Sequence, residues 1–139
     1  HFFNPPRYLR LLEIIPTPHT DQAVVDFLMD YGSLQLGKTT VLCKDTPAFI
    51  ANRIGVYSIM SLFHTVTEMG LTVEEVDKLT GPVIGRPKSA TFRTCDVVGL
   101  DTLVHVANGV KDNCPKDLVR CASFHRDCKL MRLKHLPNN

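Results

Sequence analysis

The sequence predicts an α/β remnant, built as strand, helix and strand, followed by an all-α helical domain. Within the first 46 residues, a short apolar run closed by prolines and a stretch rich in β-branched residues both favour strands. From residue 49 onward the apolar residues recur at helical spacing instead. We therefore expect two domains, residues 1–46 and residues 47–139.

The first part is expected to form one βαβ unit. The run Leu9–Ile15 is apolar and is followed by prolines, as a buried strand would be. Thr20 and Asp21 supply N-cap and first-turn chemistry for a helix that continues to about Tyr31. The predicted apolar stripe of this helix consists of Val24, Phe27, Leu28 and Tyr31. Lys38–Lys44 is rich in β-branched side chains and predicts the second strand.

The second part is expected to be a set of helices. Residues 49–69 are apolar on nearly every side, which is typical of a helix at the centre of a bundle or at a subunit interface. Thr72–Glu75 has the capping-box pattern and predicts a helix over residues 73–80. A loop rich in Gly and Pro follows at residues 81–88. One further helix is predicted from about Ala90 or Asp96 to Val110, with the apolar stripe Val97, Leu100, Val104 and Val106.

Composition narrows the classes of function. The formal net charge is +2 and basic residues are interleaved with acidic ones, so no footprint for nucleic acid or an anionic membrane is present. No uncharged apolar run is long enough to span a membrane, and the amino terminus has no secretion signal. We expect a soluble, cytoplasmic protein. Because residue 1 is His1 and not methionine, we expect a fragment, a processed product or a trimmed chain.

The cysteines favour neither disulfides nor a metal. There are five of them, an odd number without a C-x-x-C pair, which argues against a disulfide framework. Cys114, Cys121, His125 and Cys128 would be the only candidates for a metal cluster, but their spacing does not match a common zinc pattern. We expect no metal.

Two residues stand out on chemical grounds. Imidazole takes and returns protons near neutral pH, which makes His1 a candidate general base. Glu13 lies inside an apolar strand, where a carboxylate is costly unless a cation or donor faces it. A histidine near Glu13 would satisfy both needs, since the carboxylate would fix the imidazole tautomer and raise its basicity. The alternative is that His1 is merely terminal and that Glu13 lies exposed on an edge strand.

An ordered series of motifs resembles the L-3-hydroxyacyl-CoA dehydrogenase family. His1–Pro5 and Leu12–Ile15 are similar to its HFFNP and VEII segments, and Asp45–Arg53 is similar to its D-x-P-G-F-x-x-N-R segment. Gly85–Pro87 and Asp96–Thr102 are similar to its G-x-P-x-G-P and D-x-x-G-L-D-T segments. The combination is specific, although each motif alone would be weak.

The resemblance implies a fold and a set of roles. Residues 1–46 would be the end of a Rossmann-like NAD-binding domain, and residues 47–139 a helical domain of the 6-phosphogluconate dehydrogenase C-terminal-like type. His1 would be the general base, Glu13 its partner, and Asn52 a hydrogen-bonding group around the substrate oxygen. Asn4 would line the nicotinamide end of the site. Without the resemblance, Asn52 reads as a helix-surface amide or an N-cap partner.

The chain departs from the family pattern at three places. It has no Gly-rich phosphate-binding turn, so we expect the NAD-binding half to be absent and this fragment alone to be inactive. Ala48 replaces the usual glycine, and Lys88 and Ser89 stand where Gly-Pro is more common. The tail from about Leu118 lacks the usual closing G-K-K-T-G-x-G-F-Y segment.

The resemblance also implies partners and leaves alternatives. The substrate would be an L-3-hydroxyacyl-CoA of fatty-acid β-oxidation and the cofactor NAD, and the helix at residues 49–69 would form a homodimer. That helix is otherwise the buried centre of one monomer. The alternative functions are a helical dimerisation or assembly module without activity of its own, and a dehydrogenase of a related 3-hydroxy acid.

Overall fold

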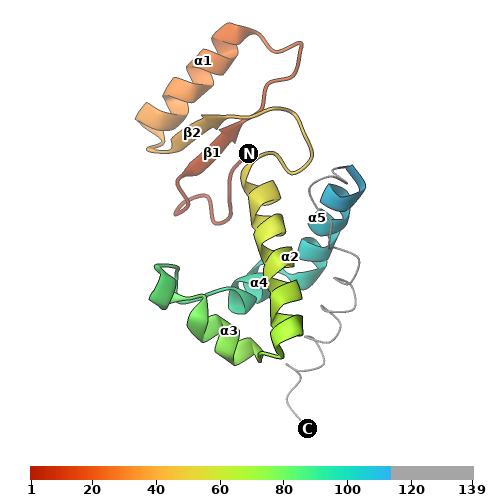
Figure 1. The fold of residues 1–139 in the computed structure, drawn as a ribbon. Coiled ribbons are helices and arrows are strands. Elements are labelled where there is room, and N and C mark those ends of the chain that lie inside the picture. Colours follow the sequence, from red (N-terminus) through yellow and green to blue (C-terminus); the bar gives the residue numbers. More distant parts are fainter. Residues whose placement is uncertain (114–139) are drawn as a thin grey trace. The chain divides into compact units, whose positions relative to one another are not determined.

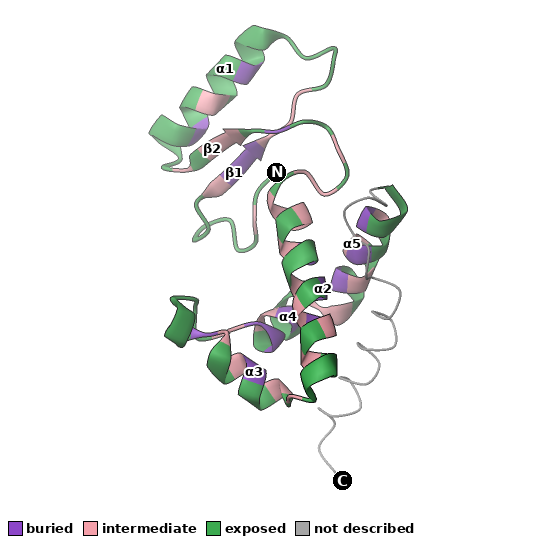
Figure 2. Ribbon diagram, in the orientation of Figure 1, coloured by how far each residue is buried: buried purple, intermediate pink, exposed green. Residues whose placement is uncertain are grey.

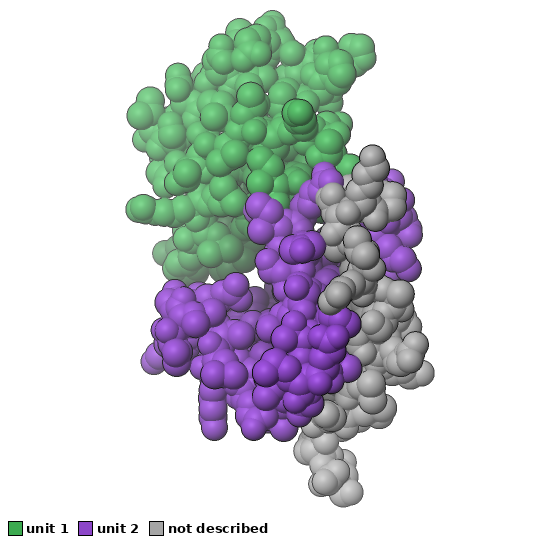
Figure 3. All heavy atoms as spheres, in the orientation of Figure 1, with its two compact units in different colours: residues 1–50 green, residues 51–139 purple. Residues whose placement is uncertain are grey.

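The computed structural model describes residues 1–113 of the chain. It divides at Ile50 and Ala51 into two compact units, which Figure 3 distinguishes by colour. We call residues 1–50 unit 1 and the described residues from 51 onward unit 2. Each unit has buried residues of its own and is described separately.

Unit 1 is a single βαβ arrangement. Strands β1 (Leu11–Ile14) and β2 (Thr39–Leu42) pair in parallel, with Glu13 opposite Val41. Between them lie helix α1 (Gln22–Asp30) and the short π-helical segment η1 (Tyr31–Gln35) (Figure 1). A parallel pair needs such a crossover, because the chain must return to the same end of the sheet. The predicted order of strand, helix and strand is confirmed.

The start of α1 and the packing of η1 have local causes. The Asp21 side chain accepts a hydrogen bond from the Ala23 N–H at 2.9 Å, which makes Asp21 the N-cap. Gly32 is buried in η1, and a Cβ atom there would lie 2.6 Å from Thr40 Cγ2 and 2.9 Å from Leu12 Cδ2. Only a residue without a side chain allows the backbone to approach the sheet so closely.

The apolar stripe predicted for α1 is not buried in this chain. Val24, Phe27, Leu28 and Tyr31 are all exposed, and Val25 is the buried residue of the helix. Figure 2 shows the mostly exposed outer surface of α1. The periodicity is helical, as predicted, but a sheet of two strands covers only a narrow strip of the helix. Which residues are covered was decided by that sheet and not by the stripe.

Unit 2 is helical in its described part. It contains α2 (Ala51–Met69), α3 (Val73–Leu79), the 3-10 turn η2 (Pro82–Ile84), α4 (Phe92–Val98) and α5 (Leu100–Asn113). Its buried centre combines residues from all four α-helices: Val56, Met60, Phe63, Val76, Phe92, Cys95, Leu103, Ala107 and Val110. The rings of Phe63 and Phe92 stack at 5.2 Å between centroids. This ring pair joins α2 to α4.

Two side chains fix the starts of helices in unit 2. The predicted capping box is confirmed: the Thr72 hydroxyl accepts from the Glu75 N–H, and the Glu75 carboxylate accepts from the Thr72 N–H. The second cap was not predicted. Asp77 of α3 accepts backbone N–H groups from Thr91 and Phe92 at 3.1 and 2.7 Å, so one helix caps the next.

Two predictions for unit 2 were wrong in detail. The single helix expected up to Val110 is two helices, because Gly99 adopts φ 92° and ψ 124° and its N–H returns to the carbonyls of Cys95 and Asp96. The predicted stripe also fails, since Val97 is 80% exposed whereas Leu103, Ala107 and Val110 are buried. A helix that restarts after a turn changes the face of its later residues, which periodicity across the break does not capture.

The long helix α2 is less uniformly buried than its sequence suggests. It begins at Ala51 and not at residue 49, because Ala48 and Phe49 have positive φ values of 60° and 49°. Val56, Met60 and Phe63 are buried, whereas Ile54 and Tyr57 are exposed. In residues 1–113 no helix has the length and apolar character needed to cross a membrane.

Candidate active site

The first residues of the chain lie alongside β1. The His1 amino group donates to the Glu13 carbonyl oxygen at 2.8 Å, and the Glu13 N–H donates to the His1 carbonyl oxygen at 3.1 Å. Phe2 and Leu12 form an antiparallel bridge next to this pair. The sheet that buries Glu13 therefore also holds His1 directly opposite it.

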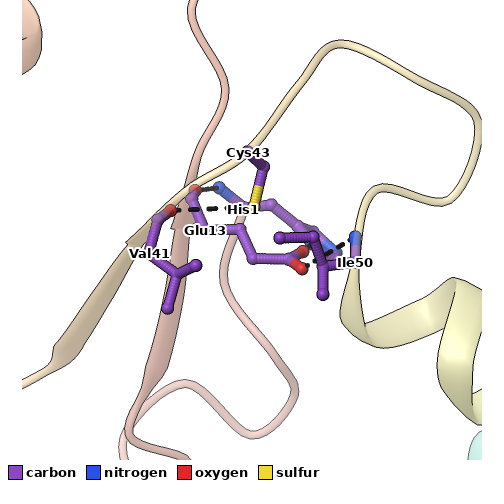
Figure 4. Close-up of polar contacts among 5 residues, drawn as sticks. All are labelled: His1, Glu13, Val41, Cys43 and Ile50. Atoms are coloured by element: carbon purple, nitrogen blue, oxygen red, sulfur yellow. Dashed lines mark hydrogen bonds and ion pairs between the residues drawn. The ribbon is translucent and has the colours of Figure 1, made fainter.

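The two side chains of this pair are in contact. His1 Nδ1 lies 2.7 Å from Glu13 Oε2 (Figure 4). The Glu13 side chain is 1% exposed and the His1 side chain 28%, so the carboxylate is buried while the imidazole keeps one accessible edge. The predicted proximity of His1 and Glu13 is confirmed, and the alternative of an exposed Glu13 is wrong. Burial strengthens a contact of this kind because water competes with it less.

Other groups surround the buried carboxylate. Glu13 Oε1 accepts a hydrogen bond from the Ile50 N–H at 3.2 Å, so both carboxylate oxygens are used. The buried Cys43 thiol, which donates to the Val41 carbonyl at 3.6 Å, lies close by. Burial raises the pKa of the Cys43 thiol, and the negative charge of Glu13 raises it further. The Cys43 thiol therefore stays neutral beside Glu13, and the His1 imidazole is the titratable ring that contacts the carboxylate.

Two aromatic rings pack against the imidazole. The Phe3 ring centroid lies 4.7 Å and the Phe49 ring centroid 5.3 Å from that of His1, both tilted by 57°. Tilted ring pairs at such separations are favourable and limit the rotation of the smaller ring. The roles of Phe3, Phe49 and the Ile50 amide were missed at the sequence level. Phe3 and Phe49 stand inside the matched motifs, whereas a backbone amide carries no sequence signal at all.

The two predicted asparagines lie in different units. Asn4 is exposed in unit 1, in the turn that follows His1, and its peptide bond to Pro5 is cis. Asn52 is half-buried in the first turn of α2 and belongs to unit 2. In residues 1–113 no three His, Cys, Asp or Glu side chains are grouped so as to hold a metal ion. The candidate cluster of Cys114, Cys121, His125 and Cys128 lies outside the described residues.

The arrangement defines a class of site. An imidazole whose Nδ1 faces a buried carboxylate is held in the tautomer with Nδ1–H, which leaves Nε2 to accept a proton. A histidine–carboxylate pair of this kind, here within the α/β part of the chain, is able to perform acid–base chemistry.

Comparison with known proteins identifies the family. Residues 1–46 match the 3-hydroxyacyl-CoA dehydrogenase NAD-binding domain, and residues 49–136 match the 3-hydroxyacyl-CoA dehydrogenase C-terminal domain. The chain belongs to the 3-hydroxyacyl-CoA dehydrogenase family, as its motifs predicted. The α/β start and the helical continuation are those of this family.

Individual relatives agree with this assignment. The chain is 54% identical over 130 residues to a probable 3-hydroxyacyl-CoA dehydrogenase of Bacillus subtilis, covering 91% of this chain and 16% of that protein. It is 52% identical over 117 residues to one of Deinococcus radiodurans, covering 84% of this chain and 34% of that protein. The crystal structure of (S)-3-hydroxybutyryl-CoA dehydrogenase from Ralstonia eutropha is 27% identical with a TM-score of 0.75, covering 96% of this chain and 44% of that one. The chain thus spans less than half the length of these relatives.

Proposed function

We propose that this chain carries the general base of an L-3-hydroxyacyl-CoA dehydrogenase, which oxidises the 3-hydroxyl group to a ketone with NAD in fatty-acid β-oxidation. The observation that carries the proposal is the contact of 2.7 Å between His1 Nδ1 and the buried Glu13 carboxylate. Family membership supplies the substrate class, and the acid–base pair supplies the chemistry that an alcohol oxidation needs.

The proposed proton transfer runs through His1. Nε2 of the imidazole accepts the proton of the 3-hydroxyl group while the C3–O bond becomes a carbonyl. Glu13 then faces a positively charged ring, and the short Nδ1–Oε2 contact stabilises that charge. NAD, when bound, supplies the hydride acceptor for C3. In the reverse direction the same imidazole returns the proton to the oxygen.

We propose a separate role for each of the two asparagines and for NAD. Asn52 would donate a hydrogen bond to the substrate oxygen, where charge develops in the transition state. We assign Asn4 to the nicotinamide end of the cofactor, because its exposed amide lies three residues along the chain from the partly exposed His1 ring. These 139 residues contain no G-x-G-x-x-G turn, so we propose that other residues of the enzyme hold the pyrophosphate.

We also propose that residues 1–46 and 47–139 act as the cofactor-side and substrate-side parts, and that α2 contributes to a homodimer. Ile54 and Tyr57 are 61% and 55% exposed on α2, so both side chains are available for contact with a second copy. A cytoplasmic location stays a prediction.

The base assignment is tested by replacing His1 in the full-length enzyme. His1→Gln keeps the size and polarity of the side chain but cannot accept the proton, so kcat for 3-hydroxybutyryl-CoA should fall about a hundredfold or more. The matched control is His64→Gln, because His64 also contacts a glutamate, Glu68, at 3.1 Å but on the surface of α2. Normal turnover by His1→Gln would refute the proposed function.

A further inference from the structure

A strained turn closes unit 1. Ala48 and Phe49 both lie in the left-handed region, at φ 60° and 49°, and the Phe49 N–H donates to the Thr46 carbonyl at 3.0 Å. Residues with side chains disfavour this region, and two in succession are rarer still. Such strain persists where the surrounding contacts require it, and it often marks a functional position.

The turn delivers two consecutive residues to the two members of the acid–base pair. The Phe49 ring packs against the His1 imidazole, with 5.3 Å between the ring centroids. The next residue, Ile50, donates its N–H to Glu13 Oε1 at 3.2 Å. Phe49 has no group that can exchange a proton. What it offers is a rigid apolar surface that restricts the tilt of the imidazole, while the Ile50 amide fixes the plane of the carboxylate.

Unit 2 contains a similar turn without an imidazole. Ala90 is also left-handed, at φ 50°, and the next two residues, Thr91 and Phe92, donate their N–H groups to the Asp77 carboxylate. Within residues 1–113, a left-handed alanine thus stands shortly before an amide that binds a carboxylate at both turns. The feature found only at the first turn is an aromatic ring placed against the partner of the carboxylate.

We propose that Phe49 is a positioning residue for proton transfer, and that the left-handed turn at Ala48–Phe49 exists to hold the His1 ring in line for it. This inference rests on the proposed function. Because displacement of a reacting group by about 1 Å can cost a hundredfold in rate, loss of the ring should lower turnover without changing the binding of substrate.

The test compares three variants of the full-length enzyme. Phe49→Leu, which removes the ring but stays apolar, should lower kcat about tenfold and leave KM for 3-hydroxybutyryl-CoA within about twofold, a partial loss of the positioning effect. Phe49→Tyr restores the ring and should restore kcat. Phe92→Leu is the control, because Phe92 stacks on Phe63 in unit 2. This variant should lower the melting temperature and leave kcat nearly unchanged.

The inference would be overturned by an unchanged kcat in Phe49→Leu, or by a kcat below the wild-type value in Phe49→Tyr. Should Phe49→Leu fail to fold, Ala48→Val decides, because a β-branched side chain opposes the left-handed turn and kcat should fall. Ala90→Val imposes the same strain in unit 2 and should leave kcat unchanged; an equal loss in both would also overturn it. Failure of the proposed function itself is distinguished by His1→Gln, which would then keep full activity.

Discussion

Glu13 of unit 1 and Asp77 of unit 2 are carboxylates that both accept backbone hydrogen bonds, but they differ in their remaining partners. Glu13 accepts the N–H of Ile50, two residues after the left-handed Ala48, and Asp77 accepts the N–H of Thr91, the residue after the left-handed Ala90. Both oxygens of Asp77 accept hydrogen bonds from backbone amides, since Oδ2 also accepts from the Arg93 N–H at 3.1 Å. In Glu13, Oε1 accepts a hydrogen bond from a backbone amide, and Oε2 contacts the His1 imidazole.

This difference separates a carboxylate of a candidate active site from one that only caps a helix. A carboxylate saturated with backbone donors only holds two elements together, whereas one that leaves an oxygen for a titratable partner can change the chemistry of that partner. We therefore expect changes at Glu13 to affect turnover and changes at Asp77 to affect stability. Changes at these two carboxylates should have the largest effects, and changes in packing at Gly32 and in the cap at Thr72 should have smaller ones.

Glu13→Gln should have the largest effect. An amide keeps the shape but loses the charge, and its N–H₂ can favour the wrong imidazole tautomer, so kcat/KM of the full-length enzyme should fall about a hundredfold or more. Asp77→Asn is the matched change in unit 2 and should leave kcat/KM within about threefold, because it touches no reacting group. Equal kinetic losses in the two variants would remove the distinction between site and cap.

Asp77→Ala should be the most destabilising of the changes considered for unit 2. It leaves three backbone N–H groups at the start of α4, those of Thr91, Phe92 and Arg93, without their acceptor. The free energy of unfolding in urea should fall by about 2–3 kcal/mol. Asp112→Ala, at an exposed position of α5, serves as the control. A loss no larger than in the control would show that the cap contributes little.

Gly32→Ala tests close packing in unit 1. The added Cβ would lie 2.6 Å from Thr40 Cγ2, so the helix must move from the sheet, at a cost of about 1–2 kcal/mol. Gly109→Ala is the opposite case in α5, where no atom of the described residues comes within 4 Å of the new Cβ. That change should raise thermal stability, because alanine favours a helix over glycine. Similar melting temperatures for the two variants would contradict the packing described for Gly32.

Thr72→Ala should have the smallest effect, about 1 kcal/mol at neutral pH, because it removes one N-cap hydroxyl. Hydrogen bonds from the Thr72 N–H and hydroxyl hold the pKa of Glu75 below its usual value of 4.5. A lowered pKa stabilises the folded state above pH 4.5, and this contribution is lost as the pH falls through the folded-state value. The difference in the free energy of unfolding between wild type and Thr72→Ala should therefore become smaller in acid. Thr72→Ser keeps the capping hydroxyl and should retain the pH-dependent stabilisation. A difference between wild type and Thr72→Ala that does not change with pH would exclude a link between the cap and the ionisation of Glu75.

Some features of the molecule could be predicted because their causes are local. The strand at Leu11–Ile14, the N-cap at Asp21 and the capping box at Thr72 depend on residues within a few positions of one another. The candidate pair was also within reach, because a glutamate in an apolar strand needs a partner and the resemblance supplied His1. These predictions used information that short segments of sequence contain.

Other features could not be predicted because their causes lie far apart in the chain. The Ile50 amide reaches Glu13 across 37 positions, and Asp77 reaches Phe92 across 15. The same limit explains the exposed Phe27, which is periodic in sequence but has too little sheet to cover it. The break at Gly99 was missed because the apolar pattern continued through it.

The sequence by itself determined the order of strand, helix and strand followed by helices, the family, and the contact partners His1 and Glu13, since each is indicated by neighbouring residues or by ordered motifs. Only the tertiary structure decided which apolar side chains are buried and that both oxygens of Glu13 are engaged. It also brought Phe49 against His1. The physical reason is that burial and hydrogen bonding depend on which distant segments meet, and no periodicity along the chain specifies that meeting.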